Sequence, residues 1–421
     1  MRVAIIGSAL AGNKGAAAML ESAVTHVTAR HPDAEITLLS MYPRSDAERN
    51  THANVRVLNA SPLRLGIAIN GAALLWRILP PLRGAIGRAV PEVGALAAAD
   101  VLLDQGGITF VDGRGKYLIY NIASILPALF TRTPVVKCAQ ALGPFRTRLN
   151  RWSAKRLLPK MAAIVSRGAV THEHLVGLGL ANVEEGADLA FALDVTADDK
   201  KGAAAKVDTA FFRAGDVVGV SPSQVLRGST DAAGGDYVAE VASQIDFITE
   251  EMGRPVFLVP HSVRMNDDKL HNNDLPVCRA IYASVASPER VLFPDAEFTS
   301  QELRHLIGEC DLFVASRFHA MVSSLAMGVP TFVIGWSHKY REVLDMFGLA
   351  SWALAYDAVT PEVFREKMRE LDASKAKVRA QLAAGVPKVR AVAMRQLDTI
   401  ERVAKERAAD RAGKKAGRKK A

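Results

Sequence analysis

The chain is poor in cysteine, with three among 421 residues, widely separated and each in or beside an apolar run. Such a low content excludes a small secreted domain held by disulfides, and the spacing fits no zinc-ligand pattern. We therefore expect no metal site, and buried thiols in a reducing compartment. The three residues are Cys138, Cys278 and Cys310.

Long uninterrupted apolar runs are also missing, although 49% of the residues are hydrophobic. The most apolar stretch, residues 65–81, is interrupted by Arg77 and ends in two prolines, so it is too short to span a bilayer. Arg83 and Arg88 follow it closely. Two arrangements of residues 61–99 stay open: a helix pair lying on a membrane surface, or an insertion packed on its own domain.

The amino terminus lacks the features of a secretory signal. MRVAIIG is a short apolar run that leads directly into a glycine turn, without a long apolar segment or a small-residue cleavage site. We expect a cytoplasmic protein, located peripherally at the inner face of the membrane if residues 61–99 form an interfacial helix pair.

The excess of basic over acidic residues is concentrated at the carboxyl terminus. Lysine and arginine exceed aspartate and glutamate by 53 to 44, a net charge of +9. Residues 402–421 hold nine basic and two acidic residues, so their net +7 accounts for most of that excess. The remainder is close to neutral in sum, so we expect no nucleic-acid partner and a disordered basic tail.

The sequence has no GxGxxG fingerprint, P-loop, kinase signature or serine elbow. The glycines that follow the apolar run at residues 3–6 are spaced too widely for a dinucleotide turn, and no clear acidic residue follows the next strand. Asn13, Lys14 and Gly15 then have two interpretations: residues that line a cleft for a phosphorylated ligand, or a glycine turn with an exposed lysine.

Short apolar runs alternate with helical patterns along most of the chain, which predicts two parallel-sheet, Rossmann-like α/β domains with a substrate cleft between them. We expect an amino-terminal domain at residues 1–200 and a second domain at residues 215–372, joined by a polar, alanine-rich linker. Residues 373–421 are expected to form a carboxyl-terminal helix and the basic tail.

Residues 310–340 contain the strongest local signal for a site. The pattern predicts a strand at residues 312–315, a helix that follows Ser316 as its N-cap, and a second strand at residues 331–334. Arg317 and His319 lie in the first helical turn, off the apolar stripe. A cation and an imidazole at a strand end and helix start are typical of an anion-binding site in α/β sheets.

Other predicted strands also end in candidate binding residues. Gly106 and Gly107 follow one strand and allow close approach of a ligand to the backbone. Arg167 and His261 each come directly after further strands.

In combination these motifs resemble the polysaccharide pyruvyl transferase family. The resemblance covers roughly residues 1–370. The motifs that carry it are GNKGAAAML at residues 12–20, Asp104-Gln105-Gly106-Gly107, Val165-Ser166-Arg167, Gly186-Ala187-Asp188, Val259-Pro260-His261 and SRFHAMVSSLAMGVPTFVIGWSHKY at residues 316–340.

The resemblance implies a glycosyltransferase-B-like fold, phosphoenolpyruvate as donor substrate with no other cofactor, and a pyruvate ketal formed on a saccharide or lipid-linked saccharide. His319 is then expected to act as general acid and base, because imidazole exchanges protons near neutral pH. Arg317 is expected to bind the donor's anionic groups, with Arg167 as a second anion ligand. The remaining expected substrate contacts, several of them on the acceptor side, are Asn13, Lys14, Gly15, Gly106, Gly107, His261 and Ser316.

Two other functions remain open at this point. One is a glycosyltransferase of the same fold that uses a sugar nucleotide, with Glu342 or Asp345 near the donor ribose. The other is a ligand-binding relative without catalytic activity.

Overall fold

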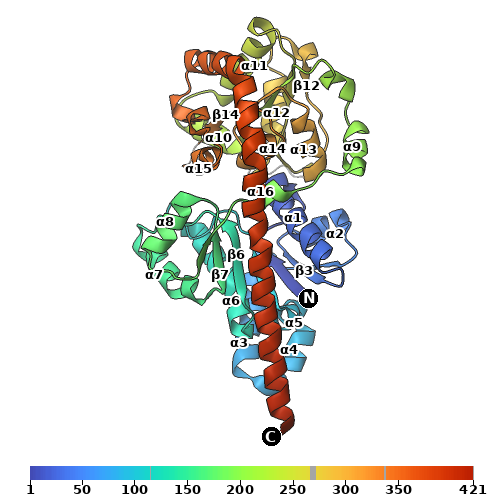
Figure 1. The fold of residues 1–421 in the computed structure, drawn as a ribbon, viewed down its shortest axis with the longest axis vertical. Helices are drawn as coiled ribbons and strands as arrows, with labels where there is room; N and C mark the ends of the chain where they lie inside the picture. Colours follow the sequence, from blue (N-terminus) through green and yellow to red (C-terminus); the bar gives the residue numbers. More distant parts are fainter. Residues whose placement is uncertain (114, 266–271, 336–337, 421) are drawn as a thin grey trace. The chain divides into compact units, whose positions relative to one another are not determined.

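The computed structural model describes residues 1–113, 115–265, 272–335 and 338–420, which form two compact units (Figure 1). Unit 1 comprises Met1–Ala11, Met19–Ala192 and Ala391–Ala421, and unit 2 comprises Gly12–Ala18 and Leu193–Arg390. The linear domain boundaries expected from the sequence stay a prediction. In the structure, the short amino-terminal segment Gly12–Ala18 belongs with unit 2.

Unit 1 is built on a seven-stranded parallel sheet in the order β4-β3-β1-β5-β6-β7-β8. The chain builds outward from β1 to β4, then returns to place β5 on the other side of β1, so the topology switches between β1 and β5. The strands are β1 (Arg2–Ile6), β3 (Glu35–Ser40), β4 (Val55–Asn59), β5 (Val101–Asp104), β6 (Val135–Gln140), β7 (Ala163–Ser166) and β8 (Val183–Glu185).

Alternating side chains of these strands supply two separate cores, one on each face of the sheet. Leu102 packs into one core and Leu103 into the other, as the two-residue period of a strand requires. The helices of the amino-terminal part are α1 (Lys14–Arg30), α2 (Pro43–Arg49), α3 (Asn70–Ile78), α4 (Arg83–Ala89), α5 (Pro91–Ala98), α6 (Gly115–Thr131), α7 (Arg148–Leu157) and α8 (Ala169–Gly177).

Unit 2 contains a six-stranded parallel sheet in the order β12-β10-β9-β13-β14-β15. Its strands are β9 (Val218–Ser221), β10 (Val256–Leu258), β12 (Val291–Leu292), β13 (Leu312–Ala315), β14 (Thr331–Gly335) and β15 (Ala353–Ala355). Its helices are α9 (Ala197–Ala204), α10 (Gln224–Ala232), α11 (Tyr237–Asp246), α12 (Leu275–Tyr282), α13 (Ser300–Gly308), α14 (Phe318–Ala326) and α15 (His338–Asp345). The two parallel α/β sheets confirm the fold class expected from the alternating pattern.

A small antiparallel ribbon brings the amino-terminal segment into unit 2. It pairs β2 (Gly12–Asn13) with β11 (Ser262–Val263), so that Asn13 lies opposite Ser262. The backbone N–H of Lys14 extends the contact by donating to the carbonyl of His261 at 3.2 Å. Residues nearly 250 positions apart in sequence are thereby fixed next to each other.

The carboxyl-terminal region differs from the expected helices and disordered tail. It forms one helix, α16 (Pro361–Lys420), which includes Pro387. Apolar residues buried at helical spacing hold it along its length, among them Leu371, Leu382 and Leu397. Near its end, the Arg411 guanidinium donates to the last carbonyls of α5, those of Ala97, Ala98 and Ala99, at 2.7–2.9 Å. The last carbonyls of a helix have no hydrogen-bond partner within the helix, so they can accept from Arg411. This contact anchors a basic segment that composition alone predicts to be unstructured.

The stretch at residues 61–99 is largely helical. It contains a π-helical turn, η1 (Arg64–Ile69), followed by α3, a short 3-10 turn η2 (Pro80–Leu82), α4 and α5. Within the described part of the chain, no helix is both long enough and apolar enough to cross a bilayer.

Candidate functional site

The carboxyl ends of three neighbouring strands form the candidate site in unit 2. Strand β9 pairs in parallel with both β10 and β13, so the residues that follow these strands meet at one edge of the sheet. His261 follows β10, and Ser316 and Arg317 follow β13. The backbone N–H of Ser316 donates to the carbonyl of Ser221, the last residue of β9, at 2.9 Å.

Helix α14 begins one residue later than the sequence predicts. Arg317 occupies the N-cap position in an extended conformation and no side chain of the described residues caps the helix, so the expected N-cap role of Ser316 is wrong. Ser316 is instead held through its carbonyl, which accepts a hydrogen bond from the Tyr340 hydroxyl at 3.2 Å. The start of α14 carries the positive partial charge of a helix amino terminus, which favours an anion nearby.

The imidazole of His319 is confined on two sides. Its ring makes an edge-to-face contact with Phe318, with 5.0 Å between ring centroids. On another side lies the backbone of Gly15, where an added Cβ would come 2.0 Å from Nδ1 of His319. Only glycine leaves room for the ring in this position. Gly15, predicted from its place in a glycine turn, is therefore a packing partner of His319.

Lys14 is almost fully buried beside this histidine. Its ammonium group forms an ion pair with Glu297, with 2.8 Å between Nζ and Oε1. The exposed lysine that the sequence left open as an alternative is thus excluded. Sequence reasoning missed Glu297, which lies between β12 and α13 in an irregular segment without a recognisable motif.

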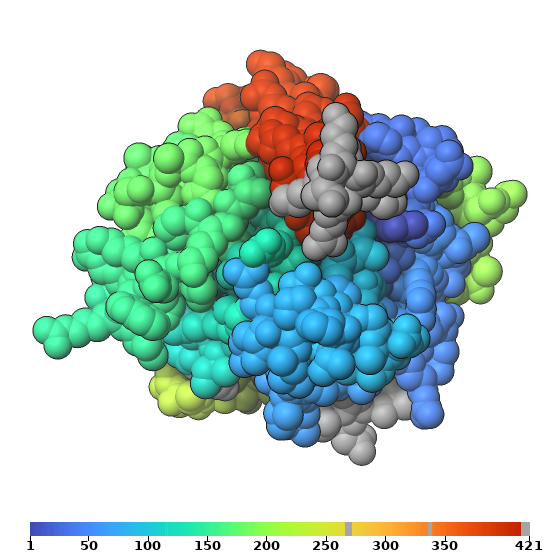
Figure 2. Space-filling view, turned by 90° about the horizontal axis from the view of Figure 1, so that it is seen from below, coloured from blue at the N-terminus to red at the C-terminus, as the bar shows by residue number. Residues whose placement is uncertain are grey.

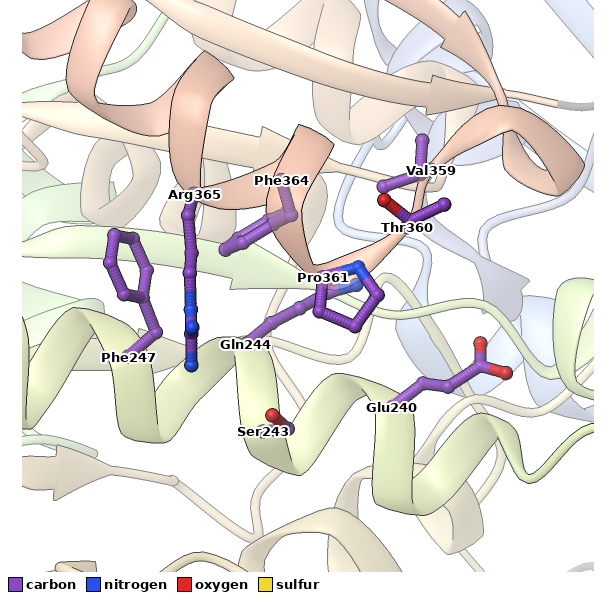
Figure 3. Close-up of a pocket in the computed structure, with 9 residues that line it drawn as sticks. All are labelled: Glu240, Ser243, Gln244, Phe247, Val359, Thr360, Pro361, Phe364 and Arg365. Carbon is purple, nitrogen blue, oxygen red and sulfur yellow. The ribbon is translucent and has the colours of Figure 1, made fainter.

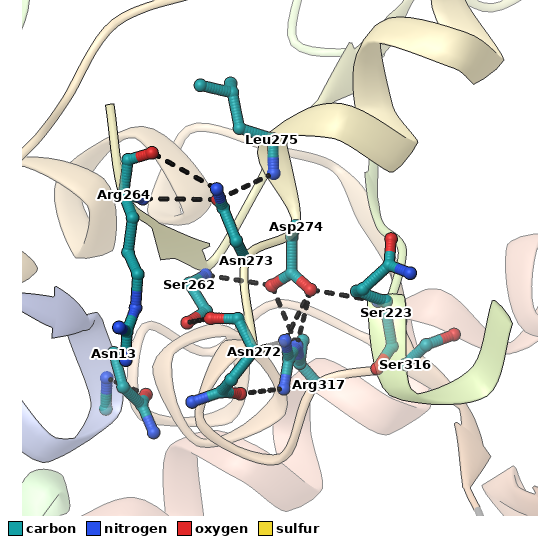
Figure 4. A network of polar contacts seen from close by, with 12 residues as sticks. Asn13, Ser223, Ser262, Arg264, Asn272, Asn273, Asp274, Leu275, Ser316 and Arg317 are labelled. Carbon is teal, nitrogen blue, oxygen red and sulfur yellow. Dashed lines mark hydrogen bonds and ion pairs between the residues drawn. The ribbon is translucent and has the colours of Figure 1, made fainter. Parts of the chain in front are cut away.

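Arg317 is held by a carboxylate that sequence reasoning also missed (Figure 4). Its guanidinium donates to the Asp274 carboxylate through both Nε and Nη2, and Nη1 donates to Oδ1 of Asn272 at 3.0 Å. Asp274 is completely buried and also accepts the backbone N–H groups of Ser262 and Gln224 at 2.8 and 3.0 Å.

Burial opposes the charge of Arg317, but the Coulombic attraction and hydrogen bonds of Asp274 outweigh it and raise the pKa of Arg317. The guanidinium is thus permanently charged and fixed in direction. The only sequence signal for Asp274 is its position at the start of a helix, α12, where acids are common.

His261 lies in a strongly electropositive environment. Burial lowers its pKa well below 6.5, and the neighbouring charges of His319, Arg317, Arg304 and Lys14 lower it further. His261 is therefore neutral at neutral pH. The same positive potential that keeps a proton off His261 favours an anion in this part of unit 2.

The remaining predicted residues lie in unit 1 and form a second group. Gly106 donates its N–H to Oδ1 of Asp104 at 3.1 Å, and Asp104 pairs with the buried ammonium of Lys137. A Cβ on Gly107 would lie 3.7 Å from Nη1 of Arg167. Arg167 is itself buried and bonded to Asp188 at 3.4 Å.

The structure thus separates the predicted residues into two sets. In unit 2 it brings together Asn13, Lys14, Gly15, His261, Ser316, Arg317 and His319. In unit 1 it brings together Gly106, Gly107 and Arg167. No group of three histidine, cysteine or acidic side chains suited to a metal ion occurs among the residues that the structure places.

A hollow of about 360 Å³ elsewhere in unit 2 lies between α11 and the start of α16 (Figure 3). Phe247 and Phe364 supply apolar wall, and Glu240 and Arg365 supply charge. None of the residues predicted from the sequence lines this hollow.

Solved structures with a similar fold define the fold class. A UDP-GlcNAc 2-epimerase from Neisseria meningitidis bound to UDP-GlcNAc matches with a TM-score of 0.60 at 11% identity, over 96% of this chain and 100% of that chain. Alr3699/HepE from Anabaena, in complex with UDP-glucose, matches with a TM-score of 0.52 at 13% identity, over 98% of this chain and 100% of that chain. At such low identity the likeness concerns the fold alone, which is glycosyltransferase-B-like.

The sequence comparison is more specific. The family description "Polysaccharide pyruvyl transferase" matches residues 13–338, more than three quarters of the chain. The amylovoran biosynthesis protein AmsJ of Erwinia amylovora is 24% identical over 377 residues, which cover 84% of this chain and 88% of that protein. The chain belongs to the polysaccharide pyruvyl transferase family.

Proposed function

We propose that this protein transfers the enolpyruvyl group of phosphoenolpyruvate to a saccharide or lipid-linked saccharide and closes it into a pyruvate ketal. Family membership supports the reaction class, and the likeness to a protein of amylovoran biosynthesis supports a role in making a cell-surface polysaccharide. The observation that carries the proposal is the packing of His319 against Gly15, at a helix start in electropositive surroundings.

The charges of unit 2 suit a donor with a phosphate and a carboxylate. The first turn of α14 carries the positive end of a helix dipole, and Arg317 beside it is held in one orientation by Asp274. Asp274 already engages the Nε–Nη2 edge of Arg317. We therefore assign Arg317 to setting the local potential and shape of the site. Any direct contact with the donor is made by its remaining N–H groups. Lys14 and neutral His261 lie in the same electropositive cluster.

The proposed chemistry needs one proton donor at the vinyl carbon. Protonation of the CH2 group by His319 turns it into a methyl group and leaves an oxocarbenium-like carbon, to which a saccharide hydroxyl adds. Inorganic phosphate leaves with the electron pair of its C–O bond, and a second hydroxyl closes the ketal. The two hydroxyl protons balance the reaction, one replacing the proton given by His319 and one leaving on phosphate.

The placement of Asn13 and Lys14 changes the role expected from the sequence. Both lie in unit 2 with His319, so we assign them to the donor side rather than the acceptor side. Gly106 and Gly107 of unit 1 are kept as proposed saccharide contacts. Arg167, expected from the sequence as a second anion ligand, is reassigned to the saccharide side because Gly107 lies close to its guanidinium.

The test is a phosphate-release assay with phosphoenolpyruvate and a panel of saccharide and glycolipid acceptors, without nucleotide, in which mass spectrometry detects the ketal. We expect phosphate release only when a suitable acceptor is present, and a loss of about 100-fold or more in kcat for His319→Gln. His305→Gln, at a partly exposed histidine of α13, is the matched control and should keep full activity. Full turnover by His319→Gln, or sugar transfer from a sugar nucleotide without phosphoenolpyruvate, would refute the proposal.

A further inference from the structure

An unpartnered apolar surface covers one side of η1, α3 and η2 in unit 1. Seven of the fourteen large hydrophobic side chains that the described chain exposes fall within residues 63–82. Leu63 is 80% exposed, Ile67 73% and Ile78 58%. The surface, named here the 63–82 patch, consists of Leu63, Ile67, Leu74, Leu75, Ile78, Leu79 and Leu82.

This segment is apolar on two opposite sides. Leu65, Ile69 and Ala73 point inward and are buried in the core of unit 1, whereas Ile67, Leu74 and Ile78 point outward. A surface helix needs only the inward stripe in order to fold, so the outward stripe is not explained by the packing of this unit. A contiguous apolar surface of this kind marks a binding face.

The helices that carry the patch are held firmly to each other. The indole of Trp76 in α3 packs against Gly87 in α4, where an added Cβ would lie 3.0 Å from the ring. The Arg83 side chain donates to the carbonyl of Trp76 at 3.0 Å. In the space-filling view of Figure 2, the light-blue atoms of this segment lie on the surface that faces the viewer. The outward side chains are therefore presented on a fixed support.

The part of the sequence that contains the patch is strongly basic. Residues 49–172 contain seventeen lysines and arginines and only four acids, a net charge of +13, which exceeds the +9 of the entire chain. No acid occurs between Glu48 and Glu92, and the exposed Arg77 and Arg88 lie within the patch segment and just beyond it.

The four acids of residues 49–172 are all engaged with partners. Glu92 pairs with Arg64 at 2.7 Å and Asp104 with Lys137. Asp100 accepts from Arg411 at 3.0 Å, and Asp112 from the backbone N–H of Arg146 at 2.6 Å. Little negative charge therefore offsets the arginines around the patch.

We propose that the 63–82 patch docks unit 1 on an anionic phospholipid surface, with its leucines and isoleucines inserted among the acyl chains and the arginines at the level of the headgroups. Apolar side chains flanked by arginine, with an acid-free sequence between, match a lipid surface of negative charge. A second copy of this chain would bring the same positive charge face to face with itself, which disfavours self-association. The proposal does not depend on the reaction that the protein catalyses.

The test uses the full chain and sucrose-loaded vesicles of phosphatidylcholine, with and without phosphatidylglycerol, in a co-sedimentation assay. We expect binding to the phosphatidylglycerol vesicles, and a loss of at least about tenfold in the partition coefficient for Ile67→Glu/Ile78→Glu. Arg77→Gln/Arg88→Gln should weaken binding to the anionic vesicles only. Val176→Glu changes an exposed valine of α8 outside the patch and should bind as the wild type does.

Thermal unfolding followed by circular dichroism shows whether the glutamate variant is folded; an unchanged melting temperature is expected because both side chains are exposed. Three results would overturn the proposal. These are no binding by the wild type, unchanged binding by the folded glutamate variant, and a wild-type dimer in light scattering that the glutamate variant converts to a monomer.

Discussion

The imidazole of His319 packs directly on the backbone of Gly15, so that a single methyl group at residue 15 would overlap Nδ1. Gly15 lies in the first turn of α1, and its helical backbone would accept alanine without strain. Glycine is therefore required at residue 15 because the histidine ring occupies the space of a side chain, and not because the backbone conformation demands it.

Gly15→Ala is expected to displace His319 and lower kcat by about 100-fold or more, because general acid–base catalysis depends on the position of the group. Steady-state kinetics with phosphoenolpyruvate and thermal unfolding measure the two effects separately. Gly71→Ala is the matched control, since this helical glycine has open space around it and should keep full activity. Equal loss of activity in both variants would show that His319 does not depend on Gly15.

Asp274→Ala is expected to destabilise the protein by about 3–5 kcal/mol, because the change leaves the Arg317 guanidinium without its buried counter-charge. It should also raise the KM for phosphoenolpyruvate, since Arg317 loses its fixed direction. Chemical denaturation and initial-rate kinetics provide the measurements. Asp198→Ala removes one partner of a fully exposed pair with Lys201 and should cost less than about 1 kcal/mol. A similar small cost for Asp274→Ala would contradict a structural role for the buried pair.

The lowered pKa of His261 predicts a stability that depends on pH. In the unfolded chain this histidine takes up a proton as the pH falls below about 6.5, whereas in the folded protein it stays neutral to lower pH. The folded state therefore loses up to about 1.4 kcal/mol per pH unit below 6.5 from this group. Denaturation of wild type and His261→Gln at a series of pH values isolates the contribution as the difference between them. A difference that does not vary with pH would exclude it.

Arg167→Lys tests the proposed saccharide role of unit 1. Lysine keeps the charge but loses the planar guanidinium that faces Asp188. The guanidinium also lies close to Gly107, where an added Cβ would be 3.7 Å from Nη1. We expect the KM for the saccharide to rise severalfold while the KM for phosphoenolpyruvate changes little. Varying each substrate in turn at saturating levels of the other measures both. The opposite pattern would place Arg167 on the donor side.

The sequence by itself determined the architecture and the location of the candidate site. Alternating apolar runs and helical periods predicted two parallel sheets, because buried strands and amphipathic helices differ in period and length. The apolar stripe of residues 318–325 placed Arg317 and His319 at a helix start after a strand, which α14 confirms. The ordered motifs also sufficed to predict the family.

Only the tertiary structure decided which residues meet. The ribbon of β2 and β11 carries Asn13, Lys14 and Gly15 into unit 2, a pairing of distant segments that no local pattern encodes. Asp274, directly before α12, became the partner of Arg317 in the same way, although the two residues are 43 positions apart in sequence. The basic terminal helix is held through Arg411, which donates to carbonyls at the end of α5, far away in sequence. Long-range contacts of this kind follow from packing, whereas the periods of strands and helices follow from the chain itself.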